Sequence, residues 1–256
     1  MHRSFVLRTL LSRNSRRCFS WSAPQVQLLR AALPHVPAYG WTQDAVAAAV
    51  ASNARLSVAA TGLVQAPYDL IAFCMDDWND QLRQILLERV NNHADEWSQL
   101  SLADRLQFAF STRLKLQQEF LQANRWHEAM AVGARPEYVV TTSEKLQTMV
   151  ETVCSLCHED DNTASLNALE QFSLGAIYVA AELHLVSNND TMTRFEDDET
   201  WNFLRQQLIH WDRLRNTTVT ALPESTATVA YVSSTLVSSL TSGLASLMFP
   251  SGMPRK

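Results

Sequence analysis

The stretch that decides the fold runs from residue 169 to residue 186 and reads LEQFSLGAIYVAAELHLV. Apolar residues lie almost all the way round the helix that this stretch predicts. The chief exceptions are Glu170, Gln171, Glu182 and His184. A helix that is apolar on nearly every side is normally buried among other helices, so the stretch predicts the central helix of a bundle.

The composition of the whole chain favours the same all-α class. The 256 residues include 6 glycines and 8 prolines, about half the share of an average globular protein. Sheet-rich folds need turn residues roughly every 8–12 positions, and this chain does not have them. No GxGxxG or GxxxxGK(S/T) motif occurs, which excludes the common phosphate-binding loops. Apolar residues make up 46% of the chain, enough for a buried core.

Apolar residues also recur at helical spacing outside the central stretch. We expect helices close to residues 26–36, 42–50, 57–64, 68–86, 101–121, 146–157 and 201–214. Thr42 is placed to cap the second of these helices. The run Ser101-Leu102-Ala103-Asp104 is a capping pattern for the fifth.

The two ends of the chain differ from its middle. Residues 1–19 contain five arginines and no acidic residue, the pattern of a mitochondrial transit peptide. An ordinary basic amphipathic helix is the alternative interpretation of these residues. The run Arg17-Cys18-Phe19-Ser20 resembles a matrix-protease site, so we expect the mature chain to begin at Ser20. Loss of the five arginines would change the formal charge from −5 to −10, which disfavours nucleic-acid binding.

Residues 225–254 contain no charged side chain. In a helical projection, Val229, Leu236, Leu240 and Leu247 gather on one side, and Ser238 and Ser242 lie elsewhere. No run of 18 apolar residues occurs in the chain, so we expect no membrane span. An uncharged amphipathic helix is compatible with lying on a bilayer, packing on a partner helix, or closing the core.

Few residues suggest catalytic chemistry. The run Cys154-Ser155-Leu156-Cys157-His158 spells the c-type haem string CxxCH, and the same side chains could contribute to a zinc site. Because the two cysteines continue an apolar helical stripe, we favour buried helix cysteines without a metal. No Glu-x-x-His pair and no HExxH motif occurs. Glu182 could have a raised pKa, although a lone buried Glu is more often structural. We expect no catalytic residue, no metal and no cofactor.

Residues 31–82 resemble the N-terminal helix-turn-helix domain of TetR-type regulators. The resemblance lies in Gly40-Trp41-Thr42, in the small-residue helix at 45–50, and in Pro67-Tyr68-Asp69-Leu70. A recognition helix presents Arg, Lys, Tyr or Asn to DNA. Here that position reads LSVAATGLV over residues 56–64, with Arg55 alone at its edge. The resemblance implies a TetR-like bundle whose helix-turn-helix is vestigial, and a ligand-responsive DNA-binding regulator is the alternative function.

The chain also resembles a narrower family, the ubiquinone (coenzyme Q) biosynthesis accessory lipid-binding proteins of the ninth Coq type. The matching runs are AALPHVPAYGWT at 31–42, Thr112-Arg113-Leu114, Trp126, Ala176-Ile177-Tyr178, Glu182-Leu183, Phe195-Glu196-Asp197 and Trp201-Asn202-Phe203-Leu204. The resemblance implies a non-enzymatic homo-oligomer, dimeric or larger, that is peripheral on the matrix side of the mitochondrial inner membrane. It implies that the protein binds isoprenoid quinone intermediates and supports the di-iron demethoxyubiquinone hydroxylase.

The resemblance implies two lipid-contacting sets and a partner surface. Pocket candidates are Val153, Phe172, Ala176, Ile177 and Leu204. Membrane or lipid contacts from the helix at 226–248 are Leu236, Leu240, Leu244, Leu247 and Met248. Partner-binding candidates are the acidic residues Glu151, Asp160 and Asp161. A second group, Leu166, Asn167 and Ala168, stands where the family has a Trp-Tyr pair. The implied regions are a transit peptide (1–19), a helix-turn-helix-like region (20–90), a lipid-binding domain (91–222) and a membrane-contacting helix with its tail (223–256).

Overall fold

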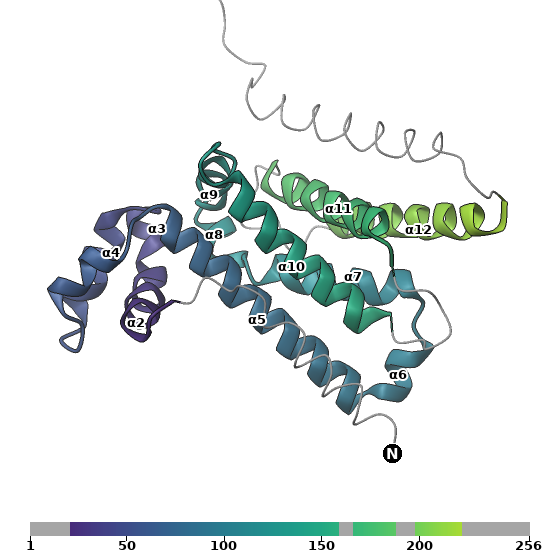
Figure 1. The fold of residues 1–256 in the computed structure, drawn as a ribbon, viewed down its shortest axis with the longest axis horizontal. Coiled ribbons are helices and arrows are strands. Elements are labelled where there is room, and N and C mark those ends of the chain that lie inside the picture. Colours follow the sequence, from purple (N-terminus) through teal and green to yellow (C-terminus); the bar gives the residue numbers. More distant parts are fainter. Residues whose placement is uncertain (1–20, 159–165, 188–197, 222–256) are drawn as a thin grey trace, which may run out of the picture. The chain divides into compact units, whose positions relative to one another are not determined.

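The computed structural model describes residues 21–158, 166–187 and 198–221, the last five without their side chains. Regular secondary structure within these ranges is entirely helical, which confirms the predicted all-α class (Figure 1). The chain divides into two compact units, Met1–Asp76 and Asp77–Lys256. The division falls within helix α5 (Tyr68–Asn92), where a continuous apolar stripe gives no sequence signal of a boundary.

The first unit contains α2 (Ala23–Ala32), η1 (Leu33–His35), α3 (Val36–Tyr39), α4 (Gln43–Ser52) and η2 (Val58–Leu63), followed by the start of α5. Gly40 ends α3 with a φ of 71°, a conformation that favours glycine. Helix α4 begins directly after Thr42, as expected, but the Thr42 hydroxyl donates to the Tyr39 carbonyl (2.9 Å) and does not cap α4. The 3₁₀ helix η2 occupies the position expected for a recognition helix, so the helix-turn-helix detail is not confirmed.

The second unit contains, after the rest of α5, α6 (Ala94–Gln99), α7 (Leu102–Lys115), α8 (Gln118–Gln122), α9 (Trp126–Gly133), α10 (Val139–Cys157), α11 (Ala168–Ser187) and α12 (Asp198–Ala221). The cap predicted for α7 is confirmed, since Ser101 Oγ accepts from the Asp104 amide at 3.1 Å. The single helix predicted over 101–121 is wrong, because the chain breaks between α7 and α8 and buries Gln117 completely.

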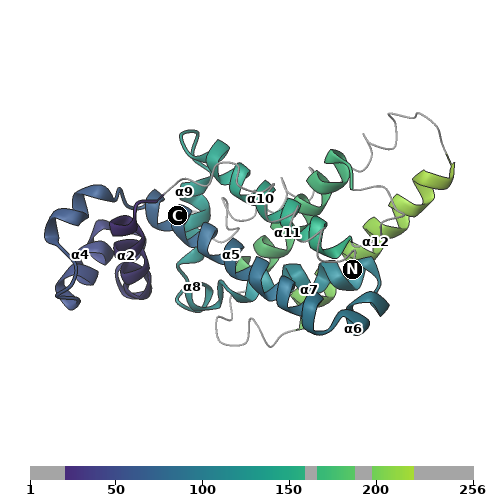
Figure 2. The same cartoon turned by 60° about the horizontal axis from the view of Figure 1, so that its bottom comes forward.

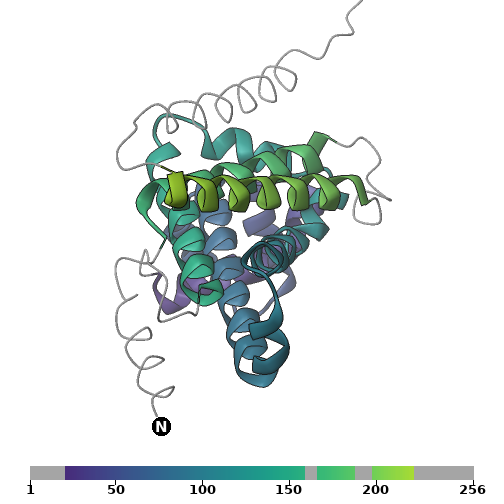
Figure 3. The same cartoon turned by 90° about the vertical axis from the view of Figure 1, so that its right-hand side faces the viewer.

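Helix α11 packs between α10 and α12, while α7 contacts both α10 and α12 (Figure 2). Helices α11 and α12 are antiparallel, because Trp211 Nε1 donates to Ser173 Oγ (2.8 Å) near one end and His184 Nδ1 lies 2.9 Å from Thr200 Oγ1 near the other (Figure 3). Leu174, Ala181 and Leu185 are fully buried. The quoted stretch is thus a core helix, although one of its sides is open.

No helix among the described residues combines the length and hydropathy that a membrane span requires.

Candidate functional site

An apolar core lies where α10, α11 and α12 pack together. Val153 on α10, Ala176 and Ile177 on α11, and Leu204 on α12 are all buried. Helices α10 and α11 pack against each other at Gly175, where a Cβ would lie 3.6 Å from Val150 Cγ2, an ordinary van der Waals distance. The structure therefore places four of the five predicted pocket residues on α11 and on the two helices, α10 and α12, that pack against it.

The fifth predicted pocket residue, Phe172, lies elsewhere. Its side chain is 66% exposed, and its neighbour Leu169, one turn earlier on α11, is 44% exposed. Phe172 therefore does not belong to the buried core, because it lies on the open side of a helix that the sequence pattern predicts to be surrounded. Periodicity places residues on faces of a helix, but it does not show which face finds a neighbour.

A buried polar cluster lies farther along α11, around Glu182. The carboxylate atom Glu182 Oε1 accepts from Gln117 Nε2 (2.5 Å) and from Trp126 Nε1 (3.0 Å). Gln117 Nε2 also lies 3.0 Å from the Tyr178 hydroxyl oxygen. These contacts join α11 to α9 and to the turn between α7 and α8, and they explain why the chain breaks at Gln117.

The Arg113 side chain extends this cluster toward α5. Arg113 is 3% exposed, and its Nε donates to Asn79 Oδ1 at 3.1 Å. Its guanidinium carbon lies 4.7 Å from the centre of the Trp78 ring, which adds a cation–π contact. Asn79 in turn donates to the Lys145 carbonyl at 3.1 Å. The cluster therefore joins α5, α7, α9, α10 and α11 around one buried carboxyl group.

Burial determines the protonation of this cluster. It raises the pKa of the Glu182 carboxyl, and the nearby Arg113 charge and the hydrogen bonds from Gln117 and Trp126 oppose that rise. Burial also raises the pKa of the Tyr178 phenol. Because both groups are kept from water, the geometry supports the structural interpretation of Glu182 that the sequence favoured.

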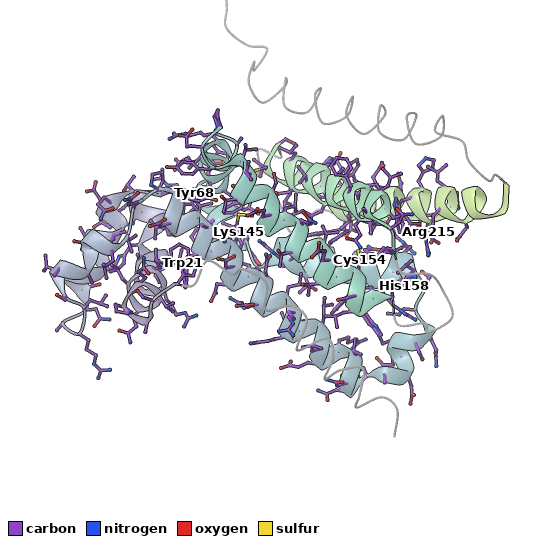
Figure 4. All side chains as sticks on the ribbon, viewed as in Figure 1. Trp21, Tyr68, Lys145, Cys154, His158 and Arg215 are labelled. Carbon is purple, nitrogen blue, oxygen red and sulfur yellow. The ribbon has the colours of Figure 1, made fainter. Side chains whose placement is uncertain are left out.

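The CxxCH residues lie at the end of α10, near Arg215 of α12 (Figure 4). Burial, with smaller contributions from Glu170 and Glu151, raises the pKa of the Cys154 thiol to about 12. This thiol is therefore neither an activated nucleophile nor a ready thiolate ligand. His158 Nε2 lies 3.4 Å from Arg215 Nη2. Among the described residues, no group of three His, Cys, Asp or Glu side chains could hold a metal ion.

The predicted partner-binding residues fall into two groups. Asn167 Oδ1 accepts from the amides of Leu169 (3.0 Å) and Glu170 (2.9 Å), so it caps α11, and Ala168 is exposed beside it. Leu166 is buried and presents no surface. Glu151 is partly exposed and accepts from Gln147. The remaining predictions lie outside the described residues: Asp160, Asp161, residues 1–19, and Leu236, Leu240, Leu244, Leu247 and Met248.

Sequence reasoning did not identify Gln117 or Arg113 as members of a site. Neither side chain interrupts an apolar stripe in a way that marks it as buried. Arg113 and Trp126 appeared only within the runs that resemble a known family, and both now lie in or beside the Glu182 cluster. The signal available was therefore the resemblance and not the periodicity.

Comparison with known proteins gives consistent matches. Residues 25–49 match the family model described as the N-terminal domain of ubiquinone biosynthesis protein COQ9. The chain is 26% identical to the probable ubiquinone biosynthesis protein coq9, mitochondrial, of Dictyostelium discoideum over 181 residues, which cover 70% of this chain and 57% of the relative. It is 28% identical to the mitochondrial COQ9 protein of Homo sapiens over 191 residues, which cover 72% of this chain and 56% of the relative.

The mitochondrial COQ9 protein of Drosophila melanogaster is 23% identical over 188 residues, which cover 73% of this chain and 54% of the relative. The chain thus spans a little over half the length of these curated relatives.

Proposed function

We propose that the protein is a non-catalytic, lipid-binding accessory factor of ubiquinone biosynthesis. The matches to COQ9 ubiquinone biosynthesis proteins support this proposal. It binds an isoprenoid quinone intermediate and presents it to the di-iron demethoxyubiquinone hydroxylase. The observation that carries this proposal is the similarity to COQ9 proteins over about 70% of the chain.

The apolar core of α10, α11 and α12 is the place proposed for the isoprenoid tail. Val153, Ala176, Ile177 and Leu204 supply only apolar surface there. Burial of an isoprenoid chain gains about 25 cal/mol per Å² of apolar area, which offsets the loss of its contacts with the bilayer. The Cys154 thiol, on the same helix as Val153, is not activated for chemistry, because burial raises its pKa to about 12.

The names of the relatives suggest where the protein acts. The COQ9 proteins of Dictyostelium discoideum and Homo sapiens are named mitochondrial. We place this chain on the matrix side of the inner membrane as a homodimer, with Leu236, Leu240, Leu244, Leu247 and Met248 in contact with the bilayer. Its net negative charge disfavours nucleic acid as a partner.

The proposed hydroxylase-binding surface lies around the end of α10 and the start of α11. Glu151, Asp160 and Asp161 supply its negative charge, and Asn167 and Ala168 supply exposed positions where the family has its aromatic pair. Because Leu166 is buried, it supports this surface from below and does not contact the partner.

Native mass spectrometry of the full chain tests lipid binding. We expect the chain purified from membrane-containing cells to carry an isoprenoid lipid. The substitution Ala176→Phe enlarges a buried side chain in the space proposed for the tail, so the variant should carry less lipid than the wild type. Overpacking of this kind also costs about 1–3 kcal/mol in folding stability, so circular dichroism must show that the variant is folded. The matched control is Val140→Phe, at a residue that is 66% exposed on α10. Repeated recovery of wild-type chain without any lipid would refute the proposal.

A further inference from the structure

One side of α11 forms an uncharged strip that the helices of the structure leave partly open. Leu169 and Phe172 are exposed in the strip, Val179 and Ala180 are partly exposed, and the buried residues Ala176 and Leu183 lie along its floor. Leu169 and Phe172, at the N-terminal end of α11, are its most exposed members. The opposite side of the same helix, which carries Leu174, Ala181 and Leu185, is fully buried. An apolar strip of this kind on a folded protein marks a contact surface.

The described part of α12 ends near this strip. Because α12 is antiparallel to α11, its C-terminal half lies beside the N-terminal end of α11: Arg215 Nε is 3.0 Å from Glu170 Oε1 (Figure 4). Helix α12 continues only from Arg215 to Ala221, which is about 9 Å at 1.5 Å per residue. The described part of the chain therefore ends, at Ala221, close to the end of the hairpin where Leu169 and Phe172 lie.

The length and the charge of the following segment match the strip. A helix over residues 226–248 would be about 35 Å long, and the 20 residues of α11 span about 30 Å. Neither the strip nor residues 225–254 contain a charged side chain, so their contact would leave no charge buried without a partner.

The apolar spacing of the two sequences also agrees. On α11, Leu169, Phe172, Ala176, Val179 and Leu183 follow one another at intervals of three and four residues. In the C-terminal segment, Val229, Leu236, Leu240 and Leu247 follow at intervals of seven and four. Both spacings put the side chains along one seam, which is the pattern of two helices packed side by side.

We propose that residues 226–248 form a helix that docks on the open strip of α11 within the same chain when no membrane is present. The apolar side that covers Phe172 is then the same side that would face a bilayer, so strip and bilayer compete for it. A short connection gives the docked segment an effective concentration of about millimolar, which favours this occupant over a second copy at low protein concentration. Membrane binding would therefore uncover Leu169 and Phe172.

Hydroxyl-radical footprinting of the full chain tests this docking without altering the strip. Modification is read at Phe172 and compared between variants, with Val140 as an internal reference because it is equally exposed at 66%. The double substitution L236D/L240D places charges on the apolar side of the segment. The matched control S238D/S242D places the same charges, at the same spacing, on its other side.

We expect Phe172 modification to rise about fivefold or more in L236D/L240D, because the charges prevent docking of a segment whose effective concentration is about millimolar. We expect it to stay unchanged in S238D/S242D. Val140 should react equally in all three chains, and circular dichroism should report equal helix content. Equal Phe172 modification in the wild type and L236D/L240D would overturn the proposal.

Two further measurements distinguish docking of residues 226–248 from contact of the strip with a second copy of the chain or with a bilayer. Phe172 protection that increases with protein concentration would assign the strip to a second copy and overturn docking within one chain. Vesicles of phosphatidylcholine and cardiolipin should raise Phe172 modification, because they draw the segment away. If they lower it, the strip itself faces the bilayer and the proposal fails. None of these results depends on recovery of a bound quinone lipid, so the proposed function is tested separately.

Discussion

Glu182 and Phe172 lie ten residues apart on α11, and each lies in the surroundings that its chemistry disfavours. The carboxyl group of Glu182 is buried with 8% exposure, whereas the Phe172 ring is 66% exposed. A buried carboxyl is tolerated only where hydrogen bonds compensate for lost water, and Glu182 has donors from Gln117 and Trp126. An exposed phenyl ring stabilises the fold little. The first residue therefore holds the bundle together, and the second is free to serve a contact.

The largest expected effect comes from the buried side of this comparison. Glu182→Leu leaves the Trp126 and Gln117 donors without their acceptor and should lower the free energy of unfolding by about 3 kcal/mol. Glu182→Gln keeps an acceptor oxygen and should lose less than half of that. Urea denaturation followed by circular dichroism measures both values. A fully stable Glu182→Leu variant would show that the cluster is dispensable.

The pH dependence of stability gives the second test. Because burial raises the pKa of Glu182 above its ordinary 4.5, the folded chain holds a proton at pH values where the unfolded chain has released it. The free energy of unfolding should therefore decrease as pH rises from 4.5 toward the folded pKa. Glu182→Gln should remove this contribution, so its stability should fall less over the same interval. Identical pH profiles for the two chains would contradict the assignment.

A smaller effect is expected at the end of α11 that carries Phe172. Arg215→Gln breaks the partly buried ion pair with Glu170, in which the two side chains are 17% and 20% exposed. The expected loss in unfolding free energy is about 1 kcal/mol. Amide hydrogen exchange should accelerate over 168–173 while the 181–185 amides keep their protection. Uniform acceleration along α11 would mean that the two ends of the helix are not independent.

The smallest change in stability is expected on the open side. Phe172→Ser removes an exposed ring and should change the free energy of unfolding by no more than about 0.5 kcal/mol. Thermal and urea unfolding measure this value, with Glu182→Leu as the reference. A loss above about 1.5 kcal/mol would show that Phe172 packs against the fold and would remove the contrast between the two residues.

The predicted fold came largely from local patterns. Apolar periodicity located the helices, and the Ser101 cap was placed correctly because a hydroxyl three residues before Asp104 acts on its own turn. The site was predicted less well. Val153, Ala176, Ile177 and Leu204 are buried on adjoining helices, as expected, whereas Phe172 is exposed. Gln117 was missed because a glutamine carries no sequence mark of being buried.

The sequence by itself determined that residues 169–186 form an apolar helix within an all-α protein, since helical spacing depends only on neighbours along the chain. Only the tertiary structure decided which side of that helix is covered. Leu174 and Leu185 are fully buried, Gln117 and Trp126 reach Glu182, and Leu169 and Phe172 are left open. The physical reason is that burial is a relation between segments distant in sequence, and each face of α11 acquires its role from what packs against it.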